Sequence, residues 1–211
     1  VMAHYLGEYD PSALVVAAVG AVDHDRLVQQ VLTALDSTGE RRWDTAQDRA
    51  PKRRATAESA QTAEPPATSV VQRESEQVNL MIGTQGLRAN DPDRFAFGIM
   101  NAVLGGGMSS RLFQEIRDKR GLAYTAYSFG ASYSDGGAFG MYAGTAPEKA
   151  AEVVRLASDE LRKVSESGIT EEEHERALGQ ISGSSALALE DSDTRMSRLA
   201  RSELGTGELY T

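Results

Sequence analysis

The feature that most constrains the fold is a run in which every second residue is aromatic or apolar, followed at once by turn residues. The alternating residues are Tyr127, Phe129, Ala131 and Tyr133. Ser134-Asp135-Gly136-Gly137 then supplies the turn chemistry of a hairpin, and Phe139 and Met141 belong to a returning strand. This segment predicts a β-hairpin and therefore a sheet with antiparallel pairing.

Helices are predicted on both sides of the hairpin. Asp91-Pro92 starts one helix, which stops at Gly105-Gly106-Gly107. A second helix follows, whose apolar side consists of Leu112, Phe113 and Ile116. Beyond the hairpin, Pro147 opens a long amphipathic helix that Gly168 stops.

The C-terminal part predicts two more helices, and one further strand precedes the first helix. Thr170 and Glu173 form a capping box at the start of one helix. Asp191 or Asp193 caps the last helix, which ends at Gly205. Val78, Leu80 and Ile82 alternate as in a strand. The predicted class is α+β, with a largely antiparallel sheet flanked by helices.

The N-terminal part predicts a separate strand–helix unit. Residues 14–20 form a continuous apolar run typical of a strand buried on both faces, and Asp23 suits the N-cap of a following helix. The pattern then stops, and residues 36–68 are interpreted as a linker. Its basic stretch, residues 41–54, can suit an anionic partner, but we favour a solvated linker because aspartates interrupt it.

Composition narrows the class of protein. The net charge of −9 argues against nucleic-acid binding, and the chain contains no cysteine for a disulfide or a thiolate metal site. No stretch approaches the ~20 apolar residues of a membrane span. We expect a cytoplasmic protein that binds neither nucleic acid nor membrane. Because the chain begins with Val1, we expect a piece of a longer protein.

The histidines do not form a zinc motif. They are His4, His24 and His174, and no two are spaced i, i+4. His174-Glu175 begins like His-Glu-x-x-His, but Leu178 occupies the second histidine position. The acidic run at 171–173 is interpreted as charge that complements a helix dipole. We expect no metal or other cofactor in this chain.

The glycines Gly105, Gly106 and Gly107 allow two interpretations. Glycines before a helix can expose backbone N–H groups to a phosphate, but the Gly-Lys-Ser/Thr ending of a Walker-type loop is absent. The alternative is a tight turn between helices, which we favour.

Arginines and tyrosines concentrate just after this loop. Arg117, Arg120, Tyr124 and Tyr127 crowd a helix end and the start of a strand. A guanidinium beside a phenol can hold peptide carbonyls and donate to a developing oxyanion. From the residues alone, exposed arginines and half-buried tyrosines remain the alternative.

Residues 104–124, Leu-Gly-Gly-Gly-Met-Ser-Ser-Arg-Leu-Phe-Gln-Glu-Ile-Arg-Asp-Lys-Arg-Gly-Leu-Ala-Tyr, resemble the characteristic segment of the pitrilysin family. This family of zinc metallopeptidases includes insulin-degrading enzyme and the mitochondrial processing peptidases. The resemblance implies that an Arg and a Tyr seven residues apart, here Arg117 and Tyr124, contact the substrate carbonyl and the oxyanion. The resemblance also implies that Gly105, Gly106 and Gly107 form a loop that contacts the substrate.

The resemblance further implies a domain organisation. Residues 1–35 would be the last strand and helix of a preceding zinc-bearing domain, and residues 69–211 a zinc-free, substrate-binding domain that is truncated at its C-terminus. The implied function is binding of peptides or unfolded proteins for a zinc metalloendopeptidase, with zinc in the missing part of the parent protein. This chain alone would be inactive. The alternative is a non-catalytic assembly subunit of a processing-peptidase-like heterodimer.

The implied partners are the substrate and a zinc-bearing domain of the same parent or of a partner subunit. Truncation would also leave an open sheet edge. We expect residues 11–35 to fill it, within one chain or by exchange in a homodimer.

Overall fold

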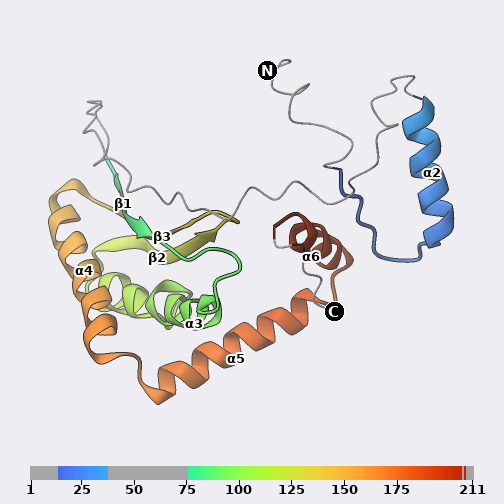
Figure 1. Cartoon of the computed structure of the whole chain (residues 1–211). Helices are drawn as coiled ribbons and strands as arrows, with labels where there is room; N and C mark the ends of the chain where they lie inside the picture. Colours follow the sequence, from blue (N-terminus) through green and yellow to red (C-terminus); the bar gives the residue numbers. More distant parts are fainter. Residues whose placement is uncertain (1–13, 38–75, 206, 208–211) are drawn as a thin grey trace. The chain divides into compact units, whose positions relative to one another are not determined.

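The computed structural model describes residues 14–37, 76–205 and 207, which divide into two compact units (Figure 1). The unit that contains the candidate site is built on a three-stranded sheet of order β1-β3-β2. The strands are β1 (Val78–Gln85), β2 (Ala123–Ser132) and β3 (Gly137–Thr145), and both pairings are antiparallel. The predicted hairpin and the predicted first strand are confirmed.

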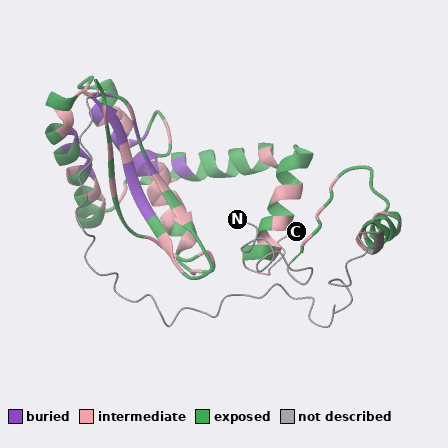
Figure 2. Cartoon of the chain, turned by 90° about the horizontal axis from the view of Figure 1, so that it is seen from above, coloured by how far each residue is buried: buried purple, intermediate pink, exposed green. Residues whose placement is uncertain are grey.

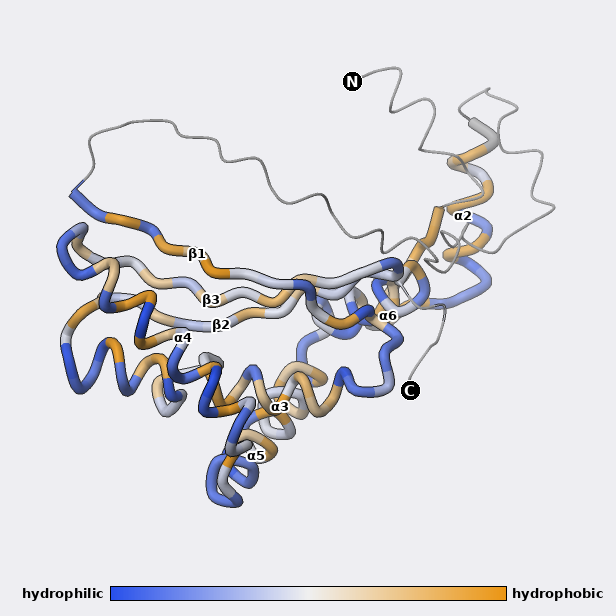
Figure 3. The backbone as a smooth tube through the Cα atoms, turned by 60° about the vertical axis from the view of Figure 1, so that its left-hand side comes forward, coloured by the Kyte–Doolittle hydropathy of each residue, from blue (hydrophilic) through white to orange (hydrophobic). Residues whose placement is uncertain are grey.

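Helices cover one face of this sheet. Helix α3 (Arg94–Gly105) packs against β2, and α4 (Ala150–Ser167) contacts β1 and β3. A short π-helix, η3 (Phe113–Asp118), lies between α3 and β2 in the chain, and the 3-10 turn η4 (Pro147–Lys149) leads into α4. Among the described elements of this unit, none lies over the opposite face of the sheet (Figures 1 and 3). The predicted α+β class, with helices flanking an antiparallel sheet, is confirmed.

The core lies between the sheet and these helices (Figure 2). Its most deeply buried apolar side chains are Leu104, Leu112, Ile116 and Val153. The rings of Phe97 and Phe139 meet edge to face with centroids 5.7 Å apart. The main hydrophobic contribution of β1 comes from Leu80 and Ile82, which pack on the core (Figure 3).

Close packing of α3 on β2 depends on Gly105. A Cβ atom at Gly105 would collide with the backbone nitrogen of Ser128. The hydroxyl of Ser128 also donates to the carbonyl oxygen of Asn101 at 3.1 Å. Glycine here lets the helix end approach the strand backbone and holds the following Gly-rich segment beside β2.

The uncovered face of the sheet carries aromatic side chains. Tyr127 and Tyr142 are directly opposite each other in the hairpin, with ring centroids 5.0 Å apart. The Tyr142 hydroxyl donates to Asn79 Oδ1 at 2.6 Å, and the neighbouring Met81 is 69% exposed. This face is an accessible aromatic surface.

Helix α5 (Glu171–Ala188) starts with the predicted capping box. The Thr170 N–H donates to Glu173 Oε2 at 2.8 Å, and the Glu173 N–H donates to Thr170 Oγ1 at 3.2 Å. Gly168 ends α4 with a φ of 72°, a conformation that favours glycine. The predicted boundary between these helices is confirmed.

The second unit contains α2 (His24–Ser37) and α6 (Ser192–Gly205). Asp23 caps α2 by accepting the Arg26 N–H at 2.8 Å, as predicted. Of the two candidate caps for α6, Asp191 is the one that accepts the Thr194 N–H, at 2.8 Å.

The strand predicted at residues 14–20 is wrong, because these residues adopt no strand in the structure. The described sheet contains only β1, β2 and β3, and the completion of its edge by residues 11–35 stays a prediction. An apolar run indicates burial, but a strand also needs a neighbouring strand to accept and donate its backbone hydrogen bonds. Among the described residues, residues 14–20 have no such neighbour. The linker at 36–68 lies almost wholly outside the described residues.

Candidate functional site

The site is built where a helix turns into β2. Leu112 and Ile116 are both buried and fix one side of the helical segment, so Arg117, the next residue, lies on its exposed side. The Arg117 guanidinium carbon lies 4.7 Å from the centroid of the Phe113 ring, four residues earlier. Gly121, with a φ of 58°, then reverses the chain toward β2. The backbone therefore brings the end of η3 next to the first residues of the strand.

A β-bulge at the start of β2 directs Tyr124 outward. Ala123 pairs with Thr145 and Thr125 pairs with Gly144, so Tyr124 has no partner on β3. The bulge lets Ala123 and Ala126 both be buried although they are three residues apart, while Tyr124 is 78% exposed. The Tyr124 ring lies 5.1 Å from the Arg117 guanidinium carbon.

Arg117 also lines a pocket of about 410 Å³ together with the Gly-rich loop. The structure thus places four predicted site residues, Arg117 and the three glycines, around one cavity, and it places Tyr124 against Arg117. The residues that line the pocket are Gly105, Gly106, Gly107, Met108, Phe113, Arg117, Thr125, Ala126, Tyr127 and Ser128. In the described part of the chain, the Arg117 side chain makes no ion pair and no hydrogen bond.

Arg120 and Tyr127, the other candidates from the sequence, are used differently. Arg120 forms an ion pair with Glu115 and donates to its backbone carbonyl oxygen at 2.9 Å. Lys119 also pairs with Glu115, and these two cations lower the pKa of Glu115 to about 2. Tyr127 lines the pocket but also packs on Tyr142. Of the two arginines, only Arg117 presents an unpaired guanidinium.

Two features, one in the site and one outside the pocket, escaped the sequence interpretation. The sequence places Phe113 on the apolar side of its helix, but its ring lies against Arg117 in the pocket wall. The i, i+4 spacing of these two residues is the signal that could have predicted this contact. Arg111 forms an ion pair with Glu173 at 2.7 Å, with both side chains largely buried. This hydrogen bond from Arg111 is the main cause that lowers the pKa of Glu173 to about 2.

No metal centre is evident in the part of the chain that the structure describes. Among residues 14–37, 76–205 and 207, no three His, Cys, Asp or Glu side chains group as metal ligands. The acidic run 171–173 forms the first turn of α5, as interpreted from the sequence. These residues do not fit a zinc site, and no chemical step is assigned to a metal here. None of the described helices has the length and apolar character of a membrane span.

Comparison with known proteins identifies similar sequences. The family described as the peptidase M16 inactive domain matches residues 4–181. An uncharacterized zinc protease of Streptomyces coelicolor is 45% identical over 205 residues, which cover 97% of this chain and 44% of that protein. An uncharacterized zinc protease of Mycobacterium tuberculosis is 40% identical over 204 residues, covering 97% and 45%. The chain therefore spans less than half the length of these relatives.

Solved structures show the same fold. The peptidase M16 inactive domain from Pseudomonas fluorescens superposes with a TM-score of 0.65 at 27% identity, covering 86% of this chain and 42% of that chain. A protease from Helicobacter pylori gives a TM-score of 0.58 at 24% identity, covering 62% and 32%. The second likeness concerns the fold alone.

Proposed function

The chain belongs to the family of the peptidase M16 inactive domain, and from this premise we propose that it is the substrate-binding part of a zinc metalloendopeptidase. Its substrates are peptides or unfolded proteins, which the parent protein cleaves. The observation that carries the proposal is the contact between Arg117 and Tyr124 at the edge of the pocket, 5.1 Å apart and both exposed. Both groups are available to a ligand.

The two side chains have complementary tasks in this proposal. The planar guanidinium of Arg117 offers several N–H donors and holds a main-chain carbonyl of the substrate. The Tyr124 hydroxyl donates to the oxyanion of the tetrahedral intermediate, as donors aimed at developing charge do in acyl transfer. Phe113 supports this arrangement because its ring restrains the Arg117 side chain. The glycines Gly105–Gly107 add backbone contacts to the same substrate.

The catalytic zinc belongs to another part of the parent protein or to a partner subunit. Similar proteins more than twice as long carry the name zinc protease, which supports a zinc-bearing part outside this chain. We assign residues 1–35 to the end of that preceding domain, residues 36–68 to a linker and residues 69–211 to the substrate-binding domain. Exchange of residues 11–35 between two chains remains part of the proposal as a route to a homodimer. A cytoplasmic location is proposed with it, since a chain without cysteine suits a reducing compartment.

The test is zinc-dependent cleavage of an unfolded fluorogenic peptide by the full-length parent protein. Tyr124→Phe removes one hydroxyl and is expected to lower kcat by about 10²–10³, the usual effect of losing an oxyanion donor. Tyr133→Phe is the matched control, because Tyr133 is also exposed, at 63%, and lies at the hairpin turn instead of the pocket. A parent that binds no zinc and cleaves nothing, even with partner subunits added, would instead be an assembly subunit.

A further inference from the structure

Three consecutive carbonyl oxygens of the Gly-rich loop already accept hydrogen bonds within the unit. Two of the donors are glutamine side chains, one from η3 and one from α5. The pairs are Gln180 Nε2 to Gly106 O at 3.1 Å, Ser110 N to Gly107 O at 3.1 Å and Gln114 Nε2 to Met108 O at 2.8 Å. Each of the three peptide planes is therefore oriented by a named donor.

The same three planes carry the N–H groups of the next residues. All described peptide bonds are trans, and in a trans peptide the N–H points opposite to the carbonyl. The N–H groups of Gly107, Met108 and Ser109 thus point away from the donors that hold the loop. Across the described residues, none of these three N–H groups donates a hydrogen bond. The loop presents donors and keeps its acceptors occupied.

These donors border a pocket that offers no carboxylate. Gly107 and Met108 line it together with Arg117, whereas neither Gln114 nor Gln180 does. The side chains that line the pocket include one cation and no Asp or Glu. A ligand with several acceptor oxygens, such as an extended peptide with its main-chain carbonyls, complements this arrangement.

We propose that Gln114 and Gln180 are positioning residues, which turn the N–H groups of the Gly-rich loop toward the carbonyl oxygens of a bound peptide. This inference rests on the proposed function and adds two residues to it. Both glutamines act through the loop, since they occupy the carbonyl oxygens behind it and do not reach the ligand. Without them the peptide planes of Gly106 and Met108 can rotate, and the N–H groups lose their common direction.

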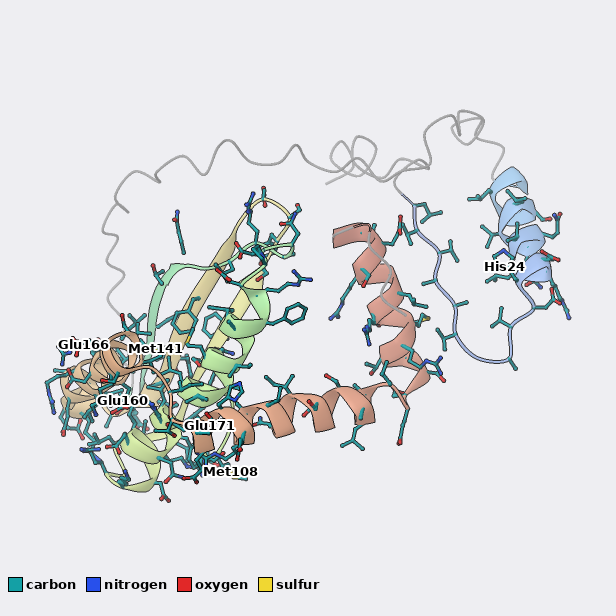
Figure 4. All side chains as sticks on the ribbon, turned by 60° about the horizontal axis from the view of Figure 1, so that its bottom comes forward. His24, Met108, Met141, Glu160, Glu166 and Glu171 are labelled. Carbon is teal, nitrogen blue, oxygen red and sulfur yellow. The ribbon has the colours of Figure 1, made fainter. Side chains whose placement is uncertain are left out.

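Helix α5 is anchored well enough to serve as the support for Gln180. Its first turn is tied to the loop region by the ion pair between Arg111 and Glu173. Figure 4 labels Met108, in the Gly-rich loop, and Glu171, in the first turn of α5. Gly105 is fixed at the other end of the loop by its contact with Ser128. The loop is consequently held at both ends, and the glutamines determine the orientation of its middle.

The test measures kcat and KM of the full-length parent protein for an unfolded fluorogenic peptide. Gln114→Ala and Gln180→Ala are each expected to raise KM about fivefold, the effect of losing one ordinary hydrogen bond. The expected kcat stays within about twofold, because the loop holds substrate equally before and during the reaction. Gln180→Glu keeps the side-chain shape but loses the N–H donor, so it should raise KM as the alanine variant does.

The control is Ser182→Glu, which adds the same charge to a different face of α5 and should leave KM unchanged. Gln180 and Ser182 are both exposed, and circular dichroism and urea unfolding verify that each variant is folded. A wild-type protein that cleaves the peptide, with unchanged KM in both glutamine variants, overturns the positioning roles and leaves the proposed function intact. A wild-type protein that neither binds nor cleaves the peptide overturns both.

Discussion

Arg111 and Glu173, 62 residues apart in the sequence, meet through two parallel hydrogen bonds of 2.7 Å each, Nε to Oε1 and Nη2 to Oε2. Arg111 also donates to the carbonyl oxygen of Gly168 at 3.2 Å, and Glu173 accepts the N–H of Thr170 at 2.8 Å. One ion pair thus connects the segment after the Gly-rich loop with the end of α4 and the start of α5.

Glu173→Gln is expected to destabilise the protein by about 2 kcal/mol, because it leaves the largely buried Arg111 without its counter-charge. The measurement is urea unfolding of the whole chain. Glu172→Gln is the matched control, since it removes the same charge from the same helical turn, where Glu172 pairs with Arg176 but is 84% exposed. Exposed pairs of this kind contribute little to stability. Equal effects of the two substitutions would contradict the role given to the Arg111–Glu173 pair.

Stability should fall in acid between about pH 4.5 and about pH 2. Arg111 lowers the pKa of Glu173 to about 2, and Lys119 followed by Arg120 lowers that of Glu115 to about 2, from an ordinary value of 4.5. A carboxyl group whose pKa is lower in the folded than in the unfolded chain stabilises the folded state when it is ionised. This contribution is complete above pH 4.5 and is lost as the pH falls through the pKa of the folded state. Urea unfolding at several pH values across this range measures how steeply the free energy of unfolding falls with pH. Glu173→Gln should reduce the slope, and an unchanged slope would argue against this origin.

Much of the fold could be predicted because its signals are local. The hairpin follows from alternation plus turn residues within one short segment, and Thr170 and Glu173 form their cap within one helical turn. The strand at 14–20 was mispredicted because strand formation requires partners elsewhere in the chain. The bulge at Tyr124 was equally invisible, since it depends on how β2 and β3 align.

The candidate site was only partly predictable for the same reason. The spacing of Arg117 and Tyr124 is a sequence pattern, whereas the shared pocket of Arg117 and the Gly-rich loop exists only after α3 packs on β2. Gln180 lies 74 residues from Gly106, and no periodicity links such a pair. The sequence assigns Glu173 only to the start of its own helix, as cap and dipole charge, because the pairing with Arg111, 62 residues away, leaves no local signal.

Gly105→Ala should destabilise the protein by about 2 kcal/mol or more, because the added Cβ collides with the backbone nitrogen of Ser128 and must push α3 away from β2. Gly98→Ala in the same helix is the control. A Cβ at Gly98 meets no atom within 4 Å, so this change should stabilise the helix by about 0.5–1 kcal/mol. Thermal unfolding of both variants measures the contrast. Similar stability of the two alanine variants would contradict the close approach of Gly105 to β2.

Arg117→Lys tests whether the shape of the guanidinium matters in addition to its charge. Lysine keeps the positive charge but loses the planar fork that can hold a carbonyl and stack on the rings of Phe113 and Tyr124. We expect kcat/KM of the full-length parent for an unfolded peptide to fall about tenfold, the scale of one charge-assisted hydrogen bond. Stability should not change, because Arg117 is exposed. Arg155→Lys on α4, whose partners are on its own helix, should leave kcat/KM unaltered. Full activity of Arg117→Lys would reduce Arg117 to a source of positive charge and contradict the directional role proposed for it in holding a peptide.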